Sequence, residues 1–240
     1  MIKKLSVLIF TMLISVIAGF AQATDTIVCS DFETPDDISN WTLVNGSEAN
    51  QWVFGTAVND GTALYISNSP SATTPPNSYT STTTTVWAYR DYQFPACNND
   101  FVLSFDWRCY GETTEGNIDL MWVYFGSPVD VTAGTSSVSG LTRLTDANGE
   151  VIRFNRQSSW QHFEGTLPID EYSGQTIRLY FLWKNDEQDD GTFPAAVDNI
   201  CLQSTCSTSC IPPVVRVTPE SPSICNGESV TLIDTITGGY

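Results

Sequence analysis

Histidine and basic residues are scarce in this sequence. Its 240 residues include one histidine, His162, and ten lysines and arginines against 27 acids, which gives a formal net charge of -17. A chain this acidic repels phosphate backbones and anionic lipid surfaces, so we expect no nucleic-acid partner. Because there is a single histidine and no Cys-x-x-Cys pair, the sequence also disfavours a zinc site.

Catalytic motifs are sparse as well. The sequence has no Gly-x-Ser-x-Gly nucleophile elbow, and His162 lies in an alternating segment without a nearby Ser or Cys motif, so we interpret it as structural. The acids Glu112, Glu115 and Asp119, in or beside a Gly-rich turn, leave glycoside hydrolysis by two carboxylates as the one enzyme alternative. Acids in such turns are usually solvated, and we predict that the protein is not an enzyme.

Long hydrophobic runs are absent except at the N-terminus. Two lysines precede the apolar run 5–20, which ends in an Ala-Gln-Ala pattern. This arrangement predicts a secretory signal peptide over residues 1–23, because the run is shorter than the roughly 20 residues of a spanning helix and a cleavage pattern follows it. Nothing in residues 24–240 resembles a membrane anchor. We expect a secreted or cell-surface protein.

The seven cysteines of an exported chain indicate disulfides, because the thiols leave the reducing compartment. The odd count leaves one thiol over, for which Cys225 is the natural candidate. Six cysteines allow 15 connectivities, among which the sequence does not choose. The six expected to pair are Cys29, Cys97, Cys109, Cys201, Cys206 and Cys210.

The chain from residue 24 to 205 carries an all-β pattern. Short apolar or alternating runs are separated by Gly, Asn, Asp, Ser and Pro clusters, and no window holds a capped helical period. The clearest alternation runs over 101–109, and 177–183 repeats it. About ten strands of this kind favour a two-sheet jelly-roll sandwich over a smaller immunoglobulin domain.

Particular motifs resemble a known family. The opening Asp31-Phe32-Glu33, then Trp41, and the closing Val-Asp-Asn-Ile of 197–200 are similar to the MAM domain and its bacterial jelly-roll relatives in secreted adhesins. The resemblance covers about residues 27–203. It implies a concanavalin-like jelly roll whose first and last strands lie side by side, used in adhesion or glycan recognition.

One cysteine departs from the MAM pattern. MAM domains commonly pair the cysteine before the opening motif with one just before the tryptophan, where this chain has Ser39 or Asn40. Cys29 therefore needs another partner. If the first and last strands are neighbours, Cys201 or Cys206 could reach it.

A second β domain is expected after the jelly roll. Residues 206–216 are interpreted as a linker, and 217–240 as the start of a further domain, too short to bury a core. Within it, 223–232 resembles the immunoglobulin-like or PKD-like repeats in exported proteins of Bacteroidetes-type bacteria. We expect the remainder of this domain, and a partner for Cys225, to lie beyond residue 240.

The resemblance also suggests a calcium site. Neighbouring first and last strands would bring Glu33 and Asp198 together, and Asp31 and Asp60 are the further candidate ligands. Calcium prefers such oxygen ligands, and its role here would be structural. The alternative is that these acids cap turns and accept bonds from backbone amides.

The leading functional hypothesis is a non-catalytic adhesion or carbohydrate-recognition module whose partner is an extracellular glycan or a surface protein. Sugar binding by a sandwich uses aromatic side chains that stack on apolar ring faces. The candidates are Trp87, Tyr89, Tyr92 and Tyr110. The alternatives are core packing for these residues and a structural spacer role for the domain.

Overall fold

The computed structural model describes residues 23–59, 61–94, 101–111, 119–167, 174–188, 193–206, 214–218 and 233–237. Within these ranges the chain is almost entirely β structure, with one short helix, α1 (Pro35–Ser39). No helix of the described residues has the length and apolarity needed to cross a membrane. The all-β prediction is confirmed.

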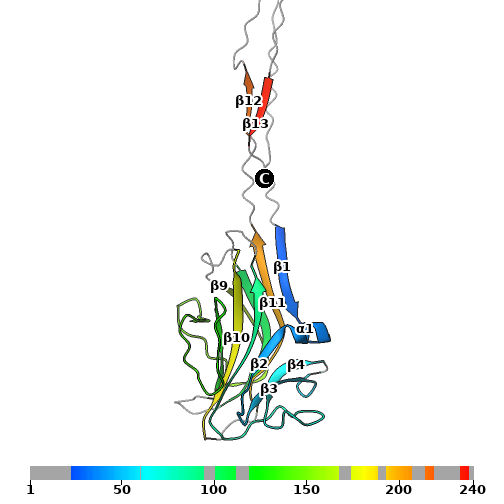
Figure 1. The fold of residues 1–240 in the computed structure, drawn as a ribbon, viewed down its shortest axis with the longest axis vertical. Helices are drawn as coiled ribbons and strands as arrows, with labels where there is room; N and C mark the ends of the chain where they lie inside the picture. Colours follow the sequence, from blue (N-terminus) through cyan, green and yellow to red (C-terminus); the bar gives the residue numbers. More distant parts are fainter. Residues whose placement is uncertain are drawn as a thin grey trace, which may run out of the picture.

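Two antiparallel sheets pack against each other as a jelly-roll sandwich (Figure 1). Sheet A has the order β3-β4-β11-β6-β9, and β1 also pairs with β11. Its strands are β1 (Ala23–Ser30), β3 (Gln51–Gly55), β4 (Ala63–Ser67), β6 (Phe101–Cys109), β9 (Gln157–Leu167) and β11 (Ala196–Cys206). Sheet B has the order β2-β5-β10-β7-β8. Its strands are β2 (Trp41–Val44), β5 (Thr84–Gln93), β7 (Leu120–Gly126), β8 (Thr142–Arg143) and β10 (Thr176–Asn185).

The core lies between the sheets and follows the alternation seen in the sequence. Phe101, Leu103 and Phe105 of β6 are fully buried, and Phe181 of β10 meets Phe105 edge-on at 5.4 Å between ring centroids. Successive strand residues point to opposite faces, so the intervening residues of β6 lie on the outer face of sheet A. The two sequence segments with the clearest alternation thus supply facing walls of one core.

The first and last strands of the sandwich are neighbours, as the resemblance implied. In Figure 1 β1 and β11 lie side by side, and their register pairs Val28 with Leu202 and Cys29 with Cys201. Cys29 and Cys201 form a disulfide. Of the two partners left open for Cys29, Cys201 is the one used. The bond closes a sequence separation of 172 residues, so it restricts the unfolded chain strongly.

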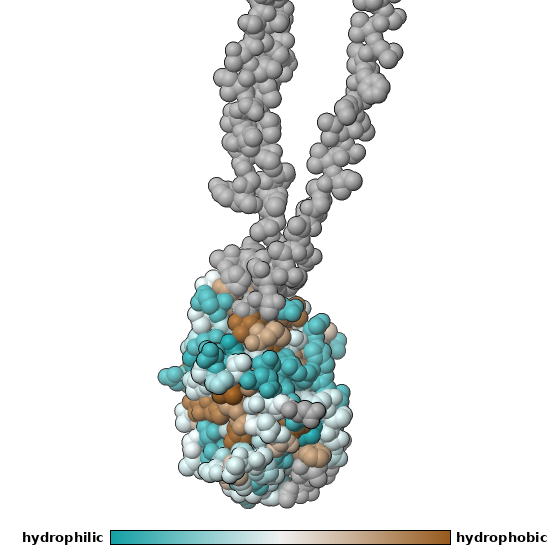
Figure 2. Space-filling model, turned by 90° about the vertical axis from the view of Figure 1, so that its right-hand side faces the viewer, coloured by the Kyte–Doolittle hydropathy of each residue, from teal (hydrophilic) through white to brown (hydrophobic). Residues whose placement is uncertain are grey.

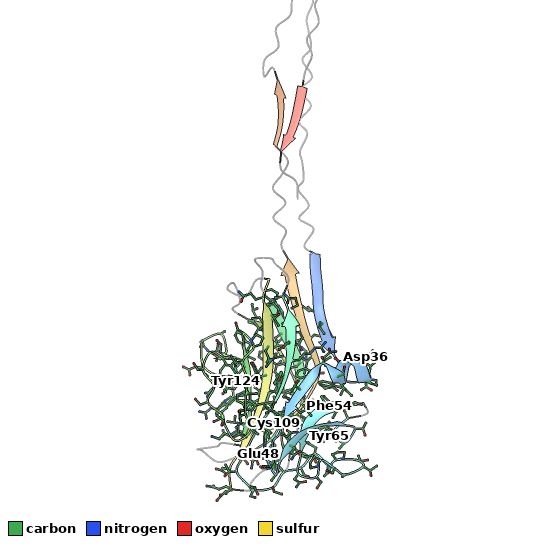
Figure 3. The ribbon with its side chains drawn as sticks, viewed as in Figure 1. Asp36, Glu48, Phe54, Tyr65, Cys109 and Tyr124 are labelled. Carbon is green, nitrogen blue, oxygen red and sulfur yellow. A yellow bond between two sulfur atoms is a disulfide. The ribbon has the colours of Figure 1, made fainter. Side chains whose placement is uncertain are left out.

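Cys109 does not form the disulfide predicted for it. Its thiol is free and fully buried, because the residue is on the inward face of β6 (Figure 3). Burial raises the pKa of the Cys109 thiol. Cys97, Cys210 and Cys225 lie outside the described residues. Cys206 is in register with Ala23 at the far end of the β1–β11 ladder.

A long connection, residues 127–141, covers the outer face of sheet B, and we call it the strap. Its Val129 N–H and C=O both bond the Tyr180 hydroxyl at 2.9 Å. The Trp87 indole donates to the Thr135 carbonyl at 2.9 Å. Apolar strap residues pack on the aromatic side chains beneath. Several side chains on the outer face of sheet B are therefore buried, namely Trp87 of β5, Tyr124 of β7, and Tyr180 and Leu182 of β10.

Two further strands follow the sandwich in the chain. β12 (Val214–Thr218) and β13 (Ile233–Thr237) pair antiparallel in a separate sheet. The repeat-like motif at 223–232 lies between them, outside the described residues. β12 begins at Val214, inside the segment expected to be a linker, and the second domain stays a prediction.

Candidate functional site

The four aromatic residues predicted to bind a ligand do not form one platform. Trp87 and Tyr92 are 0% and 2% exposed, so neither can stack on a sugar, and this part of the prediction is wrong. Trp87 lies under the strap, and Tyr92 faces the core. Tyr89 is half-buried in sheet B with the Arg178 guanidinium 4.0 Å from its ring centre, whereas the half-buried Tyr110 follows β6 of sheet A.

The strap covers part of the outer face of sheet B, whereas the outward-facing positions of β6 and β9 in sheet A are half-buried or exposed. The outer face of sheet A carries a small polar pocket of about 210 Å³, which we call the sheet A pocket. Its lining residues are Asn59, Asp106, Trp160, Asp198 and Asn199. They come from β6, β9, β11 and the turn that follows β3.

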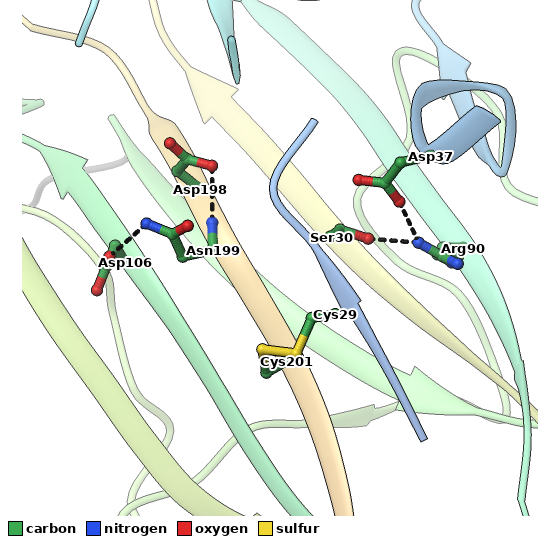
Figure 4. Close-up of a disulfide and its surroundings, with 8 residues drawn as sticks. All are labelled: Cys29, Ser30, Asp37, Arg90, Asp106, Asp198, Asn199 and Cys201. Atoms are coloured by element: carbon green, nitrogen blue, oxygen red, sulfur yellow. Dashed lines mark hydrogen bonds and ion pairs between the residues drawn. A yellow bond between two sulfur atoms is a disulfide. The ribbon is translucent and has the colours of Figure 1, made fainter. Parts of the chain in front are cut away.

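A bulge in β11 forms the floor of the sheet A pocket. The β11–β6 register shifts between Asp198 and Cys201, and Asn199 has a φ of 50°. Asparagine is one of the few residues other than glycine that adopt this left-handed conformation at low cost. Asn199 Nδ2 donates to Asp106 Oδ2 at 2.9 Å, as Figure 4 shows. The closing motif thus fixes a carboxylate on the neighbouring strand.

The other oxygen of Asp106 is held by the one histidine. His162 Nδ1 lies 2.7 Å from Asp106 Oδ1, because the two residues face each other in the β6–β9 register. The His162 side chain is 59% exposed, so it is a surface group and not part of the core. Both oxygens of Asp106 have defined partners, which restrains the carboxylate at the pocket wall.

Trp160 supplies the aromatic wall of the sheet A pocket. It is half-buried on β9, and its indole nitrogen lies 3.4 Å from the Val58 carbonyl of the turn after β3. The Arg108 guanidinium lies 5.8 Å from the Trp160 ring centre and 4.7 Å from that of Phe193. Phe193 is one of two large apolar side chains that are markedly exposed among the described residues. Figure 2 shows the side of the molecule that lies on the right in Figure 1, where hydrophilic and apolar residues alternate over the surface.

The predicted metal ligands Glu33 and Asp198 flank one turn. Glu33 Oε1 accepts from Thr62 N–H at 2.7 Å, and a side chain at Gly61 would collide with that carboxylate, since a Cβ there would lie 2.1 Å from Oε1. Asn59 Nδ2 donates to Asp198 Oδ2 at 2.5 Å. The turn after β3 therefore contacts both acids.

Asp198 lies in an unfavourable environment for a charge. Burial, aided by the nearby charges of Glu33 and Asp106, raises the pKa of Asp198 to about 6 although two amides donate to its oxygens. The Asn59 Oδ1 oxygen beside it is buried without a hydrogen-bond partner. Buried oxygens that lack a donor are uncommon and call for an explanation.

Of the two remaining predicted metal ligands, Asp31 has a local role and Asp60 is not described. Asp31 is exposed, and its Oδ1 accepts from Glu33 N–H at 3.1 Å. Asp60 lies outside the described residues. In the described part of the chain, no three His, Cys, Asp or Glu side chains gather closely enough to hold a metal ion.

Of the three acids considered for glycoside hydrolysis, the structure describes one, Asp119, and it does not face a groove. Asp119 is fully buried, accepts from the Tyr79 hydroxyl at 2.8 Å and accepts from Asp186 N–H at 2.9 Å. This bonding is that of a structural carboxylate. Glu112 and Glu115 lie outside the described residues.

Comparison with known proteins gives distant likenesses in structure alone. No family model matches the chain, and no curated protein matches it. The CBM22-1 xylan-binding domain from Paenibacillus barcinonensis Xyn10C is 12% identical, with 78% of this chain and 99% of that chain covered and a TM-score of 0.41. The family 11 carbohydrate-binding module of Clostridium thermocellum Lic26A-Cel5E is 15% identical, with 78% and 96% covered and a TM-score of 0.40. A cyclase from Fischerella sp. TAU is 11% identical, with 78% and 100% covered and a TM-score of 0.43. Each TM-score is below 0.5, so function has to be argued from the site.

Proposed function

We propose that this protein is a non-catalytic, exported carbohydrate-recognition or adhesion module, and that it binds a glycan in the sheet A pocket. The observation that carries the proposal is the combination of one indole wall, Trp160, with the restrained carboxylate of Asp106 and the amide of Asn199. A pyranose presents an apolar ring face and a rim of hydroxyls, and these groups match such a pocket.

The polar wall is suited to hydroxyl donors. Asp106 is held from two sides by His162 and Asn199, so it does not have to be ordered when a ligand arrives. Preorganised groups of this kind lose less conformational entropy on binding. Because the pocket contains two carboxylates and the chain is strongly acidic, neutral sugars should bind better than uronic acids or sulfated sugars.

A structural calcium ion belongs to the same proposal. Glu33, Asp198 and the unpartnered Asn59 Oδ1 are the groups that would hold it, with Asp31 and Asp60 as further candidates. Oxygen ligands of this type fit calcium, and a cation there would give the unpartnered amide oxygen a partner and offset the charge of Asp198, whose pKa is raised by burial. The ion would neutralise the carboxylates and tie the turn after β3 to β11.

Export fits the disulfide between Cys29 and Cys201, since such bonds persist in oxidising compartments. The absence of a catalytic role is proposed on the bonding of Asp119, the one described member of the hydrolase candidates. A spacer domain without a ligand remains the alternative that the experiment must separate.

The test is binding of the mature chain to a panel of neutral and acidic polysaccharides, in calcium and in excess chelator. We expect binding to neutral glycans that Trp160→Ala abolishes and that chelator weakens. The matched control is Trp122→Ala, which removes a half-buried indole from the opposite sheet. Absence of binding in both buffers would favour the spacer, and cleavage of any polysaccharide would overturn the non-catalytic assignment.

A further inference from the structure

A second, larger cavity lies at an open edge of the sandwich, away from the sheet A pocket. Its volume is about 580 Å³, which is within the usual size range of ligand sites. One wall is β9, the terminal strand of sheet A, and the other is the segment 144–152 that follows β8, the terminal strand of sheet B. We call this cavity the edge cavity and 144–152 the edge hairpin. The lining residues are Leu144, Thr145, Asp146, Ala147, Ile152, Phe163, Glu164, Gly165 and Thr166.

The edge cavity is amphipathic. Leu144, Ile152 and Phe163 provide an apolar floor, whereas Asp146 brings a carboxylate to the wall. Glu164 is exposed on β9 two residues after His162, so by strand alternation it adds its negative charge on the outer face of sheet A next to the cavity. No basic residue is among the described residues that line it. A ligand that combines an aliphatic stem with a positive charge therefore matches both parts of the lining.

The edge hairpin is a preformed wall. Asp146 Oδ1 accepts from Asn148 N–H at 2.9 Å and from Glu150 N–H at 3.0 Å. The Asp146 N–H donates to the Glu150 carbonyl at 2.8 Å, and Ile152 N–H donates to the Leu144 carbonyl at 3.0 Å. The backbone amides that bond its carboxylate lower the pKa of Asp146, so the rim keeps this negative charge in mildly acidic solution.

The opposite wall offers unpaired backbone. β9 pairs with β6 on one side and has no strand on the other among the described residues, so alternate residues direct N–H and C=O groups outward. Gly165 keeps this stretch free of side-chain bulk, because a Cβ there would lie 2.6 Å from the Phe163 ring. An exposed strand edge beside a side-chain pocket is the arrangement used in β-strand addition.

We propose that an extended, basic segment of a partner protein adds to the free edge of β9 and places a lysine or arginine side chain in the edge cavity. Its methylene groups would lie on Phe163 and Ile152, and its cation would reach Asp146, while Glu164 would attract the basic segment from the outer face of the sheet. The partner's backbone would bond the outward-facing groups of β9. This site goes beyond glycan binding and gives the domain a second, protein-directed surface.

A sugar is a poorer match to the edge cavity than a basic side chain. The Phe163 ring is packed at 5.0 Å from Phe105 and 5.6 Å from Phe154, and it also covers Gly165. It therefore presents less of a flat open face than the indole in the sheet A pocket. The Asp146 carboxylate, the nearby charge of Glu164 and the absence of a lining base among the described residues favour a cation.

The test uses fluorescence anisotropy with a labelled peptide in which Thr and Val alternate around a central Lys, added to the full chain at low salt. Asp146→Asn, which keeps an oxygen to accept the backbone bonds of the edge hairpin, should weaken binding about fivefold, the size expected for one exposed charge pair. Replacing the lysine by norleucine should have a similar effect, and N-methylation of alternate peptide bonds should abolish binding. Glu187→Gln, an exposed acid outside the cavity, is the matched control and should change nothing.

Three outcomes would overturn the proposal. These are no binding of the lysine peptide, equal binding of the lysine and norleucine peptides, and displacement of the peptide by a neutral glycan. Trp160→Ala separates the two sites, because it should remove glycan binding and leave peptide binding intact. Failure of the sheet A pocket would then be distinguishable from failure of the edge cavity.

Discussion

Asn199 and Asp106 are joined by a 2.9 Å hydrogen bond that links a bulge in β11 to a carboxylate on β6. The bond depends on the left-handed backbone of Asn199, which places its amide over the outer face of sheet A. The left-handed backbone position and the candidate binding group are therefore parts of one arrangement. Sparsely populated backbone conformations of this kind cluster at functional sites.

The first prediction separates the backbone role of Asn199 from its side-chain role. Asn199→Ala should lower the free energy of unfolding by about 1–2 kcal/mol more than Asn199→Gly, because a left-handed conformation disfavours a Cβ without local hydrogen bonding. Both variants lose the bond to Asp106, so both should weaken glycan binding alike. Urea unfolding and polysaccharide titration measure the two effects, and equal stability of the variants would contradict the backbone argument.

The second prediction concerns the pH dependence that Asp198 creates. Its pKa is raised to about 6 in the folded, metal-free protein, so the folded state binds this proton more tightly than the unfolded state does. The group therefore costs no stability below about pH 4 and costs roughly 1–3 kcal/mol once the pH has risen past 6. Unfolding in chelator at several pH values should show this fall in the parent chain and lose it in Asp198→Asn.

Calcium should reverse that fall. At pH 7 added calcium should raise the unfolding free energy of the parent chain, because the ion binds the folded state. Asp198→Asn should respond much less. Equal responses of the two chains would show that the ion, if bound, does not use Asp198.

The third prediction concerns the cysteines. The double variant Cys29→Ser, Cys201→Ser should lose about 2–4 kcal/mol of stability, because the disulfide restricts the unfolded chain over a long loop. Cys109 should not react with a thiol reagent in the folded protein, since it is fully buried. Urea unfolding measures the loss of stability. Mass spectrometry of alkylated protein, native and denatured, checks the reactivity, and native labelling of Cys109 would contradict its burial.

The fourth prediction tests whether the strap is structural. Tyr180→Phe removes the hydroxyl that bonds both the N–H and the C=O of Val129, and it should cost about 1–3 kcal/mol. Glycan binding should be unchanged at temperatures where the variant is folded, because the sheet A pocket lies on the opposite sheet. Enhanced glycan binding by Tyr180→Phe would instead mean that the strap covers a binding surface.

The strands and their inward faces were predictable because a buried strand leaves a period-two signature in its own residues. Phe101, Leu103 and Phe105 carry that signature, and the structure buries all three. The neighbouring position of β1 and β11 followed from a resemblance in the opening and closing motifs, and the Cys29–Cys201 disulfide agrees with it.

The facing of Trp87 could not be predicted, because it depends on a segment distant in sequence. The strap at 127–141 buries an outer face that local alternation alone would leave open. Tyr180 and Leu182, on the outward side of β10, are fully buried for the same reason. The residue pattern within β5 or β10 does not show that the strap covers their outer face.

The sheet A pocket was only partly predictable. Asp198 came from the closing motif, whereas Asp106 and Trp160 meet it in the pocket through the register of β6, β9 and β11. A usable signal existed, since Asp106 and His162 both occupy polar positions of alternating segments. Deciding that they face each other required the strand pairing.

The pairing of Ala23 with Cys206 and of Cys29 with Cys201 has a mechanical consequence. A force that pulls residue 23 away from residue 206 breaks the hydrogen-bonded pairs of the β1–β11 ladder one after another, starting from that end. Peeling can proceed along the outer part of the ladder and must then stop at the covalent bond. Tension applied through residues 23 and 206 would therefore be borne by the disulfide before it reached the core or the bulge at Asn199.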